Sequence, residues 1–177
     1  MVGTGTVLAD NPQLTVRGTE LADAWQPTRV VVDSSGRVDP AAAVFDGAAP
    51  TLVATTERAP EACVRAYEAA GAEVIVLEAD PSGGVSPTAL VAALGKRDVQ
   101  GVLLEGGATL AWSFLREDAI DRIVQYIAPL VVAGATAHGV VGGAGFAPID
   151  AARDLNFRRV ERVGPDLRVE ADVHRDH

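Results

Sequence analysis

The sequence has little that binds metal. It contains a single cysteine, Cys63, and three histidines, His138, His174 and His177. One cysteine excludes an internal disulfide and any zinc site built from several thiolates. The histidines are not clustered, and no H-E-x-x-H motif occurs. We therefore predict no metal site, and the lone thiol favours a cytoplasmic location.

Basic residues are also few. The sequence contains 15 Lys and Arg residues and 24 Asp and Glu residues, which gives a net charge of −9. Without a basic stripe, the chain is a poor candidate for binding nucleic acid or an anionic membrane. The longest apolar runs are too short to span a bilayer, and Met1 is followed by no signal-peptide pattern. We expect a small-molecule partner, held by a few local donors.

The 177 residues, 48% of them hydrophobic, predict one folded domain covering residues 1–177. Apolar runs rich in valine and leucine do not alternate with polar residues, which is typical of strands buried on both faces of a parallel sheet. These predicted strands are 29–35, 51–56, 72–78 and 101–107.

Helical segments separate these runs. Ser86 and Pro87 form a capping pair, and Gly71 is a stop signal. The predicted helices are 60–71, 86–96 and 108–117. A further strand at 122–133 carries Pro129, which indicates a bulge or an edge. The tail predicts a hairpin, 156–163 with 167–173, around "GPD". The fold class is therefore α/β, a mostly parallel sheet flanked by helices with a C-terminal antiparallel hairpin.

The stretch "LLEGGATLAWSFL" (103–115) is a candidate ligand site. A buried strand, two glycines and a helix follow one another, and ligands of open α/β sheets bind beyond the carboxyl ends of strands. Backbone N–H groups at a helix start favour phosphate, and Gly106 and Gly107 let a ligand approach closely. Thr109 adds a hydroxyl, and Glu105 lies at the same edge. A tight turn with a solvated glutamate explains the pattern equally well. Neither G-x-G-x-x-G nor a P-loop is present.

Two further stretches carry polar residues at turns. In "TVLADNPQLTVR" (6–17), Asp10 and Arg17 either flank the Glu105 site or form a turn with a solvated arginine. In "VVVDSSGR" (30–37), Ser34 and Ser35 either donate to a ligand phosphate or cap a turn.

Taken together, "VGTGTVLADNPQLTVRG" and "GVLLEGGATLAWSFLREDAIDRIVQYIAPLVVAG" resemble the reductase domain of the bifunctional riboflavin-biosynthesis deaminase–reductase family. "RVVVDSSGRVDP" and "RRVERVGPDLRVEADV" match it too, so the resemblance spans essentially the whole chain. It implies a dihydrofolate-reductase-like fold and a homodimer that pairs through a sheet edge and the C-terminal hairpin.

The resemblance also implies the activity: NADPH reduces the ribosyl group of 5-amino-6-(5-phosphoribosylamino)uracil, a phosphorylated pyrimidine, to a ribityl group. Hydride passes from the nicotinamide to the ribose carbon after the aminoglycoside opens to an imine, so the protein chiefly aligns the two carbons. The implied catalytic residues are Glu105 and Asp10, although the sequence does not decide which is the general acid.

The remaining site residues also follow from the resemblance. Leu14, Arg17 and Glu105 match substrate positions, with Arg17 a partner for the substrate phosphate. Cofactor positions fall in three stretches, and they are Thr6, Asp10, Ser34, Gly107, Ala108, Thr109, Leu110, Ala111, Trp112 and Ser113.

The sequence departs from the family pattern in two ways. The zinc signature of the deaminase, H-x-E with P-C-x-x-C, is absent, so we expect no deamination. In the family a strand, a loop and a helix precede "VGTGTVLAD", so we expect exposed apolar surface, lower stability or a partner chain in their place. Two alternatives stay open: reduction of another pterin or pyrimidine such as dihydrofolate, and a catalytically inactive nucleotide-binding module.

Overall fold

The computed structural model describes residues 1–18, 25–134 and 139–173. They fall into two compact units, Met1–Leu110 and Ala111–His177, which are described separately. Histidines 138, 174 and 177 lie outside the described residues. None of the helices described is both long enough and apolar enough to cross a membrane.

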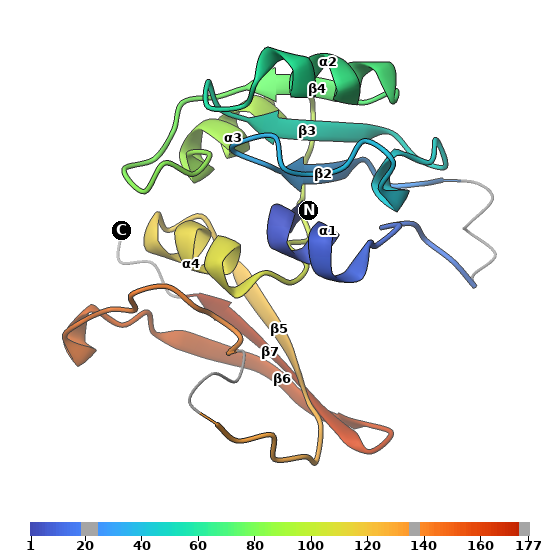
Figure 1. Cartoon of the computed structure of the whole chain (residues 1–177). Coiled ribbons are helices and arrows are strands. Elements are labelled where there is room, and N and C mark those ends of the chain that lie inside the picture. The colour runs from blue at the N-terminus through green and yellow to red at the C-terminus, as the bar shows by residue number, and fades with distance from the viewer. Residues whose placement is uncertain (19–24, 135–138, 174–177) are drawn as a thin grey trace. The chain divides into compact units, whose positions relative to one another are not determined.

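The first unit contains a parallel sheet of four strands in the order β1-β2-β3-β4 (Figure 1). Their bounds are Val2–Gly3, Arg29–Val32, Thr51–Thr55 and Glu73–Val76. Every residue of β2 and β3 is buried, as expected for strands covered on both faces. Three of the predicted strands are thus present, each shorter than its apolar run because the run continues into the following loop. The expected burial is wrong for β4, whose first and last residues are exposed, because it lies at the edge of the sheet.

The predicted helices are also present, as α2 (Glu61–Ala69), α3 (Pro87–Gly95) and α4 (Ala108–Arg116). Ser86 caps α3, because its side chain accepts a hydrogen bond from the Ala89 N–H. Gly71 follows the end of α2 with φ +88°, which suits glycine. Short 3₁₀ turns, η1 and η2, cover Ala43–Phe45 and Ile149–Ala151.

The opening stretch contains a helix that the sequence analysis did not predict. After the short strand β1, α1 runs over Thr4–Asp10 and ends at Asn11. Asn11 has φ +42°, and its N–H bonds to the Val7 carbonyl. Asparagine is one of the few residues that adopt this left-handed conformation readily, so the "DNP" signal ends a helix instead of bending a loop.

The prediction of a strand at 101–107 is wrong for this structure. The segment has no strand assignment, although the Met1 amino group donates to the Leu103 carbonyl and the Glu105 N–H donates to the Met1 carbonyl. These two bonds make one rung of a parallel ladder, and a strand needs consecutive rungs. Val102 and Leu103 are 46% and 67% exposed, so the apolar run is not buried either.

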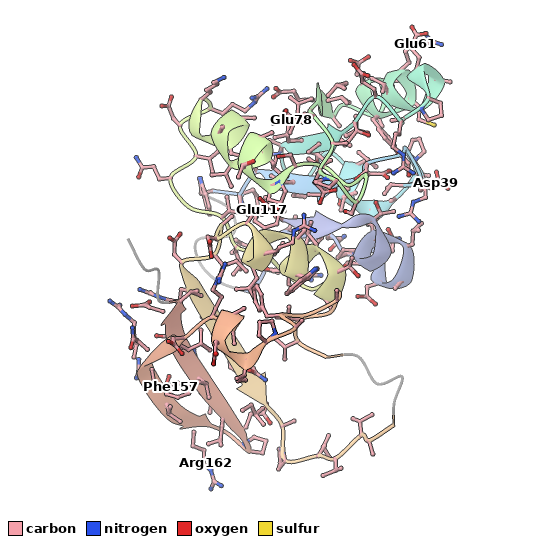
Figure 2. The ribbon with its side chains drawn as sticks, turned by 90° about the vertical axis from the view of Figure 1, so that its left-hand side faces the viewer. Asp39, Glu61, Glu78, Glu117, Phe157 and Arg162 are labelled. Atoms are coloured by element: carbon pink, nitrogen blue, oxygen red, sulfur yellow. The ribbon has the colours of Figure 1, made fainter. Side chains whose placement is uncertain are left out.

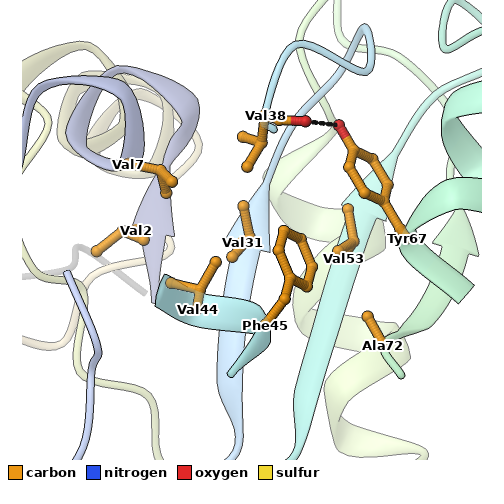
Figure 3. Packing of buried hydrophobic residues seen from close by; sticks show 9 residues of the cluster. All are labelled: Val2, Val7, Val31, Val38, Val44, Phe45, Val53, Tyr67 and Ala72. Atoms are coloured by element: carbon orange, nitrogen blue, oxygen red, sulfur yellow. Dashed lines mark hydrogen bonds between the residues drawn. The ribbon is translucent and has the colours of Figure 1, made fainter. Parts of the chain in front are cut away.

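A hydrophobic cluster lies between the sheet and the helices α1, η1 and α2 (Figure 3). Valines from β1, α1, β2 and β3 pack against aromatic side chains from η1 and α2. Phe45 and Tyr67 stack with ring centroids 5.5 Å apart. The full cluster is Val2, Val7, Val31, Val38, Val44, Phe45, Val53, Tyr67 and Ala72.

The second unit contains an antiparallel sheet in the order β5-β7-β6 (Figure 1). The hairpin of β6 (Leu155–Val163) and β7 (Asp166–Val173) is confirmed, and β5 (Arg122–Ile127) pairs with β7. The hairpin therefore shares a sheet with β5, separate from the parallel strands. The strand predicted at 122–133 ends at Ile127, two residues before Pro129, which has no N–H to continue the ladder.

Candidate functional site

Thr6 lies against the turn that precedes α4. A Cβ atom built on either Gly106 or Gly107 would lie 3.4 Å from Thr6 Oγ1. Both glycines adopt positive φ angles, +63° and +79°, a conformation that disfavours any residue with a Cβ. The structure thus brings together a hydroxyl and a glycine turn that lie 100 residues apart in the sequence.

Asp10, another predicted site residue, belongs to the helix that carries Thr6. Asp10 is four residues after Thr6 in α1, so the two side chains share a helix face. Asp10 is exposed. Gly3 lies beside α4, since a Cβ there would be 3.5 Å from Leu110 Cδ2.

The predicted cofactor positions 107 to 113 form the Gly106–Gly107 turn and the first two turns of α4. Ala108, Thr109 and Leu110 belong to the first unit and Ala111, Trp112 and Ser113 to the second. Within the second unit, the Trp112 ring packs edge-on against Phe146 with centroids 4.9 Å apart. A Cβ on Gly143 would overlap the Trp112 ring at 2.1 Å, so one side of this tryptophan is already covered.

Glu105 precedes the glycine turn and its side chain is exposed. Its N–H donates to the Met1 carbonyl at 2.8 Å, which fixes the backbone. Burial lowers the pKa of the Met1 amino group, and the nearby Glu105 charge partly offsets this. The carboxylate therefore lies close to the start of β1 with its oxygens accessible.

The two predicted substrate residues of the opening stretch differ in environment. Leu14 adopts φ +53° and packs against the hydrophobic cluster. The exposed Arg17 donates to Gln13 Oε1 at 3.0 Å.

This segment is anchored by Arg29, a residue to which the sequence analysis gave no role. Arg29 is 2% exposed and bonds to the Gln13 carbonyl and to Asp46 Oδ1. The pKa of the Asp46 carboxyl is lowered, first by the Ala48 N–H and then by Arg29.

Ser34 lies elsewhere in the first unit, after the end of β2. Its Oγ accepts a hydrogen bond from the Val85 N–H at 3.0 Å. It lines an open pocket of about 420 Å³ together with Ser35, Arg37, Arg58 and the Ser82–Gly84 loop. Ser34 therefore belongs to a polar region distinct from the glycine turn that Thr6 contacts.

Asp33 is the second residue that the sequence analysis missed. Its side chain is fully buried, and Oδ2 accepts from the N–H groups of Arg37 and Val38 and from the Tyr67 hydroxyl. The Thr4 hydroxyl lies 3.1 Å from Oδ1. One carboxylate thus ties α1, the turn after β2 and α2 together. The residues that it joins are up to 34 positions apart, so no local pattern reveals the role.

The glycine turn fits the phosphates of a dinucleotide better than it fits a metal. Two glycines without Cβ atoms, a hydroxyl and the start of a nine-residue helix supply donors and space for an anion. Among the described residues, no three His, Cys, Asp or Glu side chains gather into a group that could hold a metal ion.

Comparison with known proteins gives the family. The profile of the RibD C-terminal domain matches residues 1–169. The 2,5-diamino-6-ribosylamino-4(3H)-pyrimidinone 5′-phosphate reductase of Methanothermobacter thermautotrophicus is 37% identical over 173 residues, covering 98% of this chain and 78% of that protein. Riboflavin biosynthesis protein RibD of Chlamydia pneumoniae is 36% identical over 170 residues, covering 96% of this chain.

The chain spans 44% of the length of that RibD protein. Among solved structures, RibD of Acinetobacter baumannii aligns with a TM-score of 0.78 and 26% identity, covering 98% of this chain and 46% of the other. The predicted fold, dihydrofolate-reductase-like and α/β, is thereby confirmed. The chain belongs to the RibD C-terminal domain family.

Proposed function

We propose that this chain is a reductase domain of riboflavin biosynthesis, which uses NADPH to reduce the ribosyl group of 5-amino-6-(5-phosphoribosylamino)uracil to a ribityl group. One observation carries the proposal: the Thr6 hydroxyl packs against the Gly106–Gly107 turn at the start of α4, in a chain of this family. We further propose that residues 1–177 act as one reductase domain.

NADPH supplies the hydride in this reaction, and the protein supplies binding and alignment. The backbone of the glycine turn and the first turn of α4 hold the phosphates, with Thr6 and Asp10 alongside. Glu105 contacts the ribose hydroxyls, and Arg17 contacts the substrate phosphate through its planar guanidinium. Either Glu105 or Asp10 donates the proton, and both carboxylates are exposed.

A matched pair of glycine variants tests the cofactor site. In Gly107→Ala the new Cβ would lie 3.4 Å from Thr6 Oγ1 at φ +79°. The left-handed conformation alone costs about 1–2 kcal/mol, and the methyl group occupies the space for the phosphate. We expect the KM for NADPH to rise about tenfold, which corresponds to about 1.4 kcal/mol.

Gly101→Ala is the control, because a Cβ there has no neighbour within 4 Å. Its KM for NADPH should stay within about twofold of the unmodified chain, since surface changes rarely exceed about 0.5 kcal/mol. Equal effects of the two variants on the KM for NADPH would count against a cofactor site at the glycine turn. Comparing the pH profiles of Glu105→Gln and Asp10→Asn identifies the proton donor, because its loss removes one limb of the profile.

A second substrate has specific support. The relative from Methanothermobacter that is 37% identical carries the name of a reductase for the diamino pyrimidinone, which still has the amino group that deamination removes. We propose this compound as the alternative substrate. Measuring NADPH oxidation with the phosphoribosylamino uracil, with the diamino pyrimidinone and with dihydrofolate shows which of these three compounds is the substrate. Binding of NADPH without any oxidation would instead support an inactive module.

We propose that the chain forms a homodimer through the antiparallel sheet. Register places Phe157 and Ile123 opposite Ala171, and Val160 opposite Val169, so their side chains share one face. Phe157 and Val160 are 71% and 59% exposed, and Figure 2 shows Phe157 at the surface of the sheet. Large exposed apolar side chains on one face of a sheet favour association.

Phe157→Asp places a charge in this apolar face and should convert the dimer to a monomer in analytical ultracentrifugation. An unchanged mass for this variant would argue against the proposed interface. We also propose a cytoplasmic location, which suits the free thiol of Cys63.

A further inference from the structure

The segment that carries Leu14 and Arg17 belongs to no helix or strand, since residues 11–17 have no such assignment. Side chains from the stretch that leads into β2 bind its backbone instead. Arg29, the first residue of β2, donates to the Gln13 carbonyl at 3.2 Å. This bond holds the front of the segment, four residues before Arg17.

Gln26 holds the other end of the segment. The Val16 N–H donates to Gln26 Oε1 at 2.9 Å, and Gln26 Nε2 donates to the Val16 carbonyl at 3.1 Å. A side-chain amide carries both an acceptor and donors, so Gln26 binds both backbone groups of one residue, as a neighbouring antiparallel strand does. The Val16 carbonyl belongs to the peptide group that joins Val16 to Arg17. The two bonds therefore fix the backbone directly before Arg17.

The residues that follow Gln26 restrict its own position. Pro27 limits the backbone of Gln26 to extended conformations. β2 begins two residues after this proline, and all four of its residues are buried. Gln26 therefore extends from a fixed strand of the sheet, and its two hydrogen bonds tie the backbone of Arg17 to that strand.

The side chain of Arg17 has little else to place it. It is exposed, and among the described residues it makes one hydrogen bond, to Gln13 Oε1 at 3.0 Å. An arginine side chain carries about 2 kcal/mol of rotamer entropy. Paired N–H donors bind a phosphate well only in a fixed geometry, so the position of the backbone at Arg17 matters for binding.

We propose that Gln26 is a positioning residue for the substrate phosphate. Its amide fixes the Val16–Arg17 peptide group, so that the Arg17 guanidinium presents its donors at one place. The inference rests on the proposed function, in which Arg17 contacts that phosphate. The proposed cofactor residues lie on α1, at Ser34 and at the glycine turn, so Gln26 should affect the pyrimidine and leave NADPH alone.

Kinetics of Gln26→Met test this role. Methionine is unbranched and of similar length, so it fills the space without making either hydrogen bond. We expect the KM for the pyrimidine to rise about tenfold, with kcat and the KM for NADPH unchanged. Gln100→Met is the control, because Gln100 is an exposed glutamine outside the segment, and both KM values should stay within about twofold. An unchanged KM for the pyrimidine, or an equal rise in the KM for NADPH, would overturn the inference.

A double variant shows whether Gln26 acts through Arg17. Arg17→Ala alone removes the guanidinium and should raise the KM for the pyrimidine about 10- to 100-fold. Adding Gln26→Met should then change this KM by less than about twofold, because two residues that act through one contact are not additive. If the two rises multiply in the double variant, Gln26 acts by another route and the inference is wrong.

A binding measurement tests the same role without turnover. NMR titration compares ribose 5-phosphate with ribose, and only the phosphorylated probe should lose affinity, about tenfold, in Gln26→Met. If the chain reduces its substrate and Arg17→Ala weakens binding while Gln26→Met does not, the inference is wrong and the function stands. If no pyrimidine turns over while both variants weaken ribose 5-phosphate binding, the proposed activity is wrong and the positioning role stands.

Discussion

Replacing Asp33 by alanine tests the buried network that orders the turn after β2. The carboxylate accepts from the Arg37 and Val38 N–H groups at 2.7 and 2.9 Å and from the Tyr67 hydroxyl at 2.8 Å. Alanine removes every one of these acceptors. The Thr4 hydroxyl keeps the Val32 carbonyl at 3.1 Å, so it stays satisfied.

The expected loss follows from the donors left without an acceptor. The Tyr67 hydroxyl retains the Val38 carbonyl at 2.9 Å (Figure 3). The Arg37 and Val38 N–H groups have no such substitute. The Val38 N–H is buried and the Arg37 N–H is partly buried. Because an unsatisfied buried donor costs about 1–3 kcal/mol, Asp33→Ala should lower the free energy of unfolding by about 3 kcal/mol. That is a large share of the roughly 5–15 kcal/mol that stabilises a domain.

Urea denaturation followed by circular dichroism measures this loss. Asp39→Ala is the matched control. Asp39 is exposed, and within the described part of the chain its Oδ1 accepts only the Ala41 N–H, in an exposed turn (Figure 2). The control should lose less than about 1 kcal/mol. A loss below about 1 kcal/mol in Asp33→Ala would refute the view that this carboxylate orders the turn.

Two further predictions concern buried polar groups. Burial, and then the hydrogen bond to Asp33, raise the pKa of the Tyr67 hydroxyl. The unfolded chain therefore loses this proton at lower pH than the folded one, and stability falls above the ordinary tyrosine pKa of about 10, by up to about 1.4 kcal/mol per pH unit. Urea titrations from pH 9 upward should show a shallower fall in Tyr67→Phe, and parallel slopes would contradict the assignment. Arg29→Met should cost about 2 kcal/mol, because it leaves the carbonyls of Gln13 and Ala49 without their donor, whereas the exposed Asp46 carboxylate can bind water instead. Chemical denaturation measures this loss, and a value below about 0.5 kcal/mol would show that these hydrogen bonds are dispensable.

The sequence predicted the parallel strands well because their signal is local. "RVVVDSS" and "TLVATT" are continuous apolar runs, and burial on both faces requires that pattern. The helix α1 was missed because "TGTVLAD" contains glycine and two threonines, which have low helix propensity. Tertiary packing stabilises it instead, since Val7 is buried in the cluster and Thr4 bonds to β2. Residues 101–107 show the opposite error, since the sequence predicted a strand that the structure lacks. An apolar run becomes a strand only where a neighbouring strand pairs with it.

The residues of the candidate site also differ in whether a local sequence pattern could predict them. Thr6 and Gly107 lie far apart in the sequence, and only the family resemblance placed them in one site. The glycine turn itself was predictable, since two adjacent glycines before a helix indicate a positive-φ turn. Arg58 gave no local signal, because its position depends on a bond to Gly83, 25 residues further along the chain.

The arginines of this chain differ in whether they pair with a carboxylate. A chain with a net charge of −9 has more carboxylates than it needs to neutralise its cations. On the antiparallel sheet, Arg122 and Arg158 both pair with Asp172, and Arg168 pairs with Glu161. Such pairs on an exposed surface leave little charge to attract a ligand. Arg37 and Arg58 have no acidic partner among the described residues, yet both line one pocket. In an acidic protein, two cations without a carboxylate partner at one place favour an anionic ligand there, which agrees with the proposed cofactor position Ser34 in the same pocket.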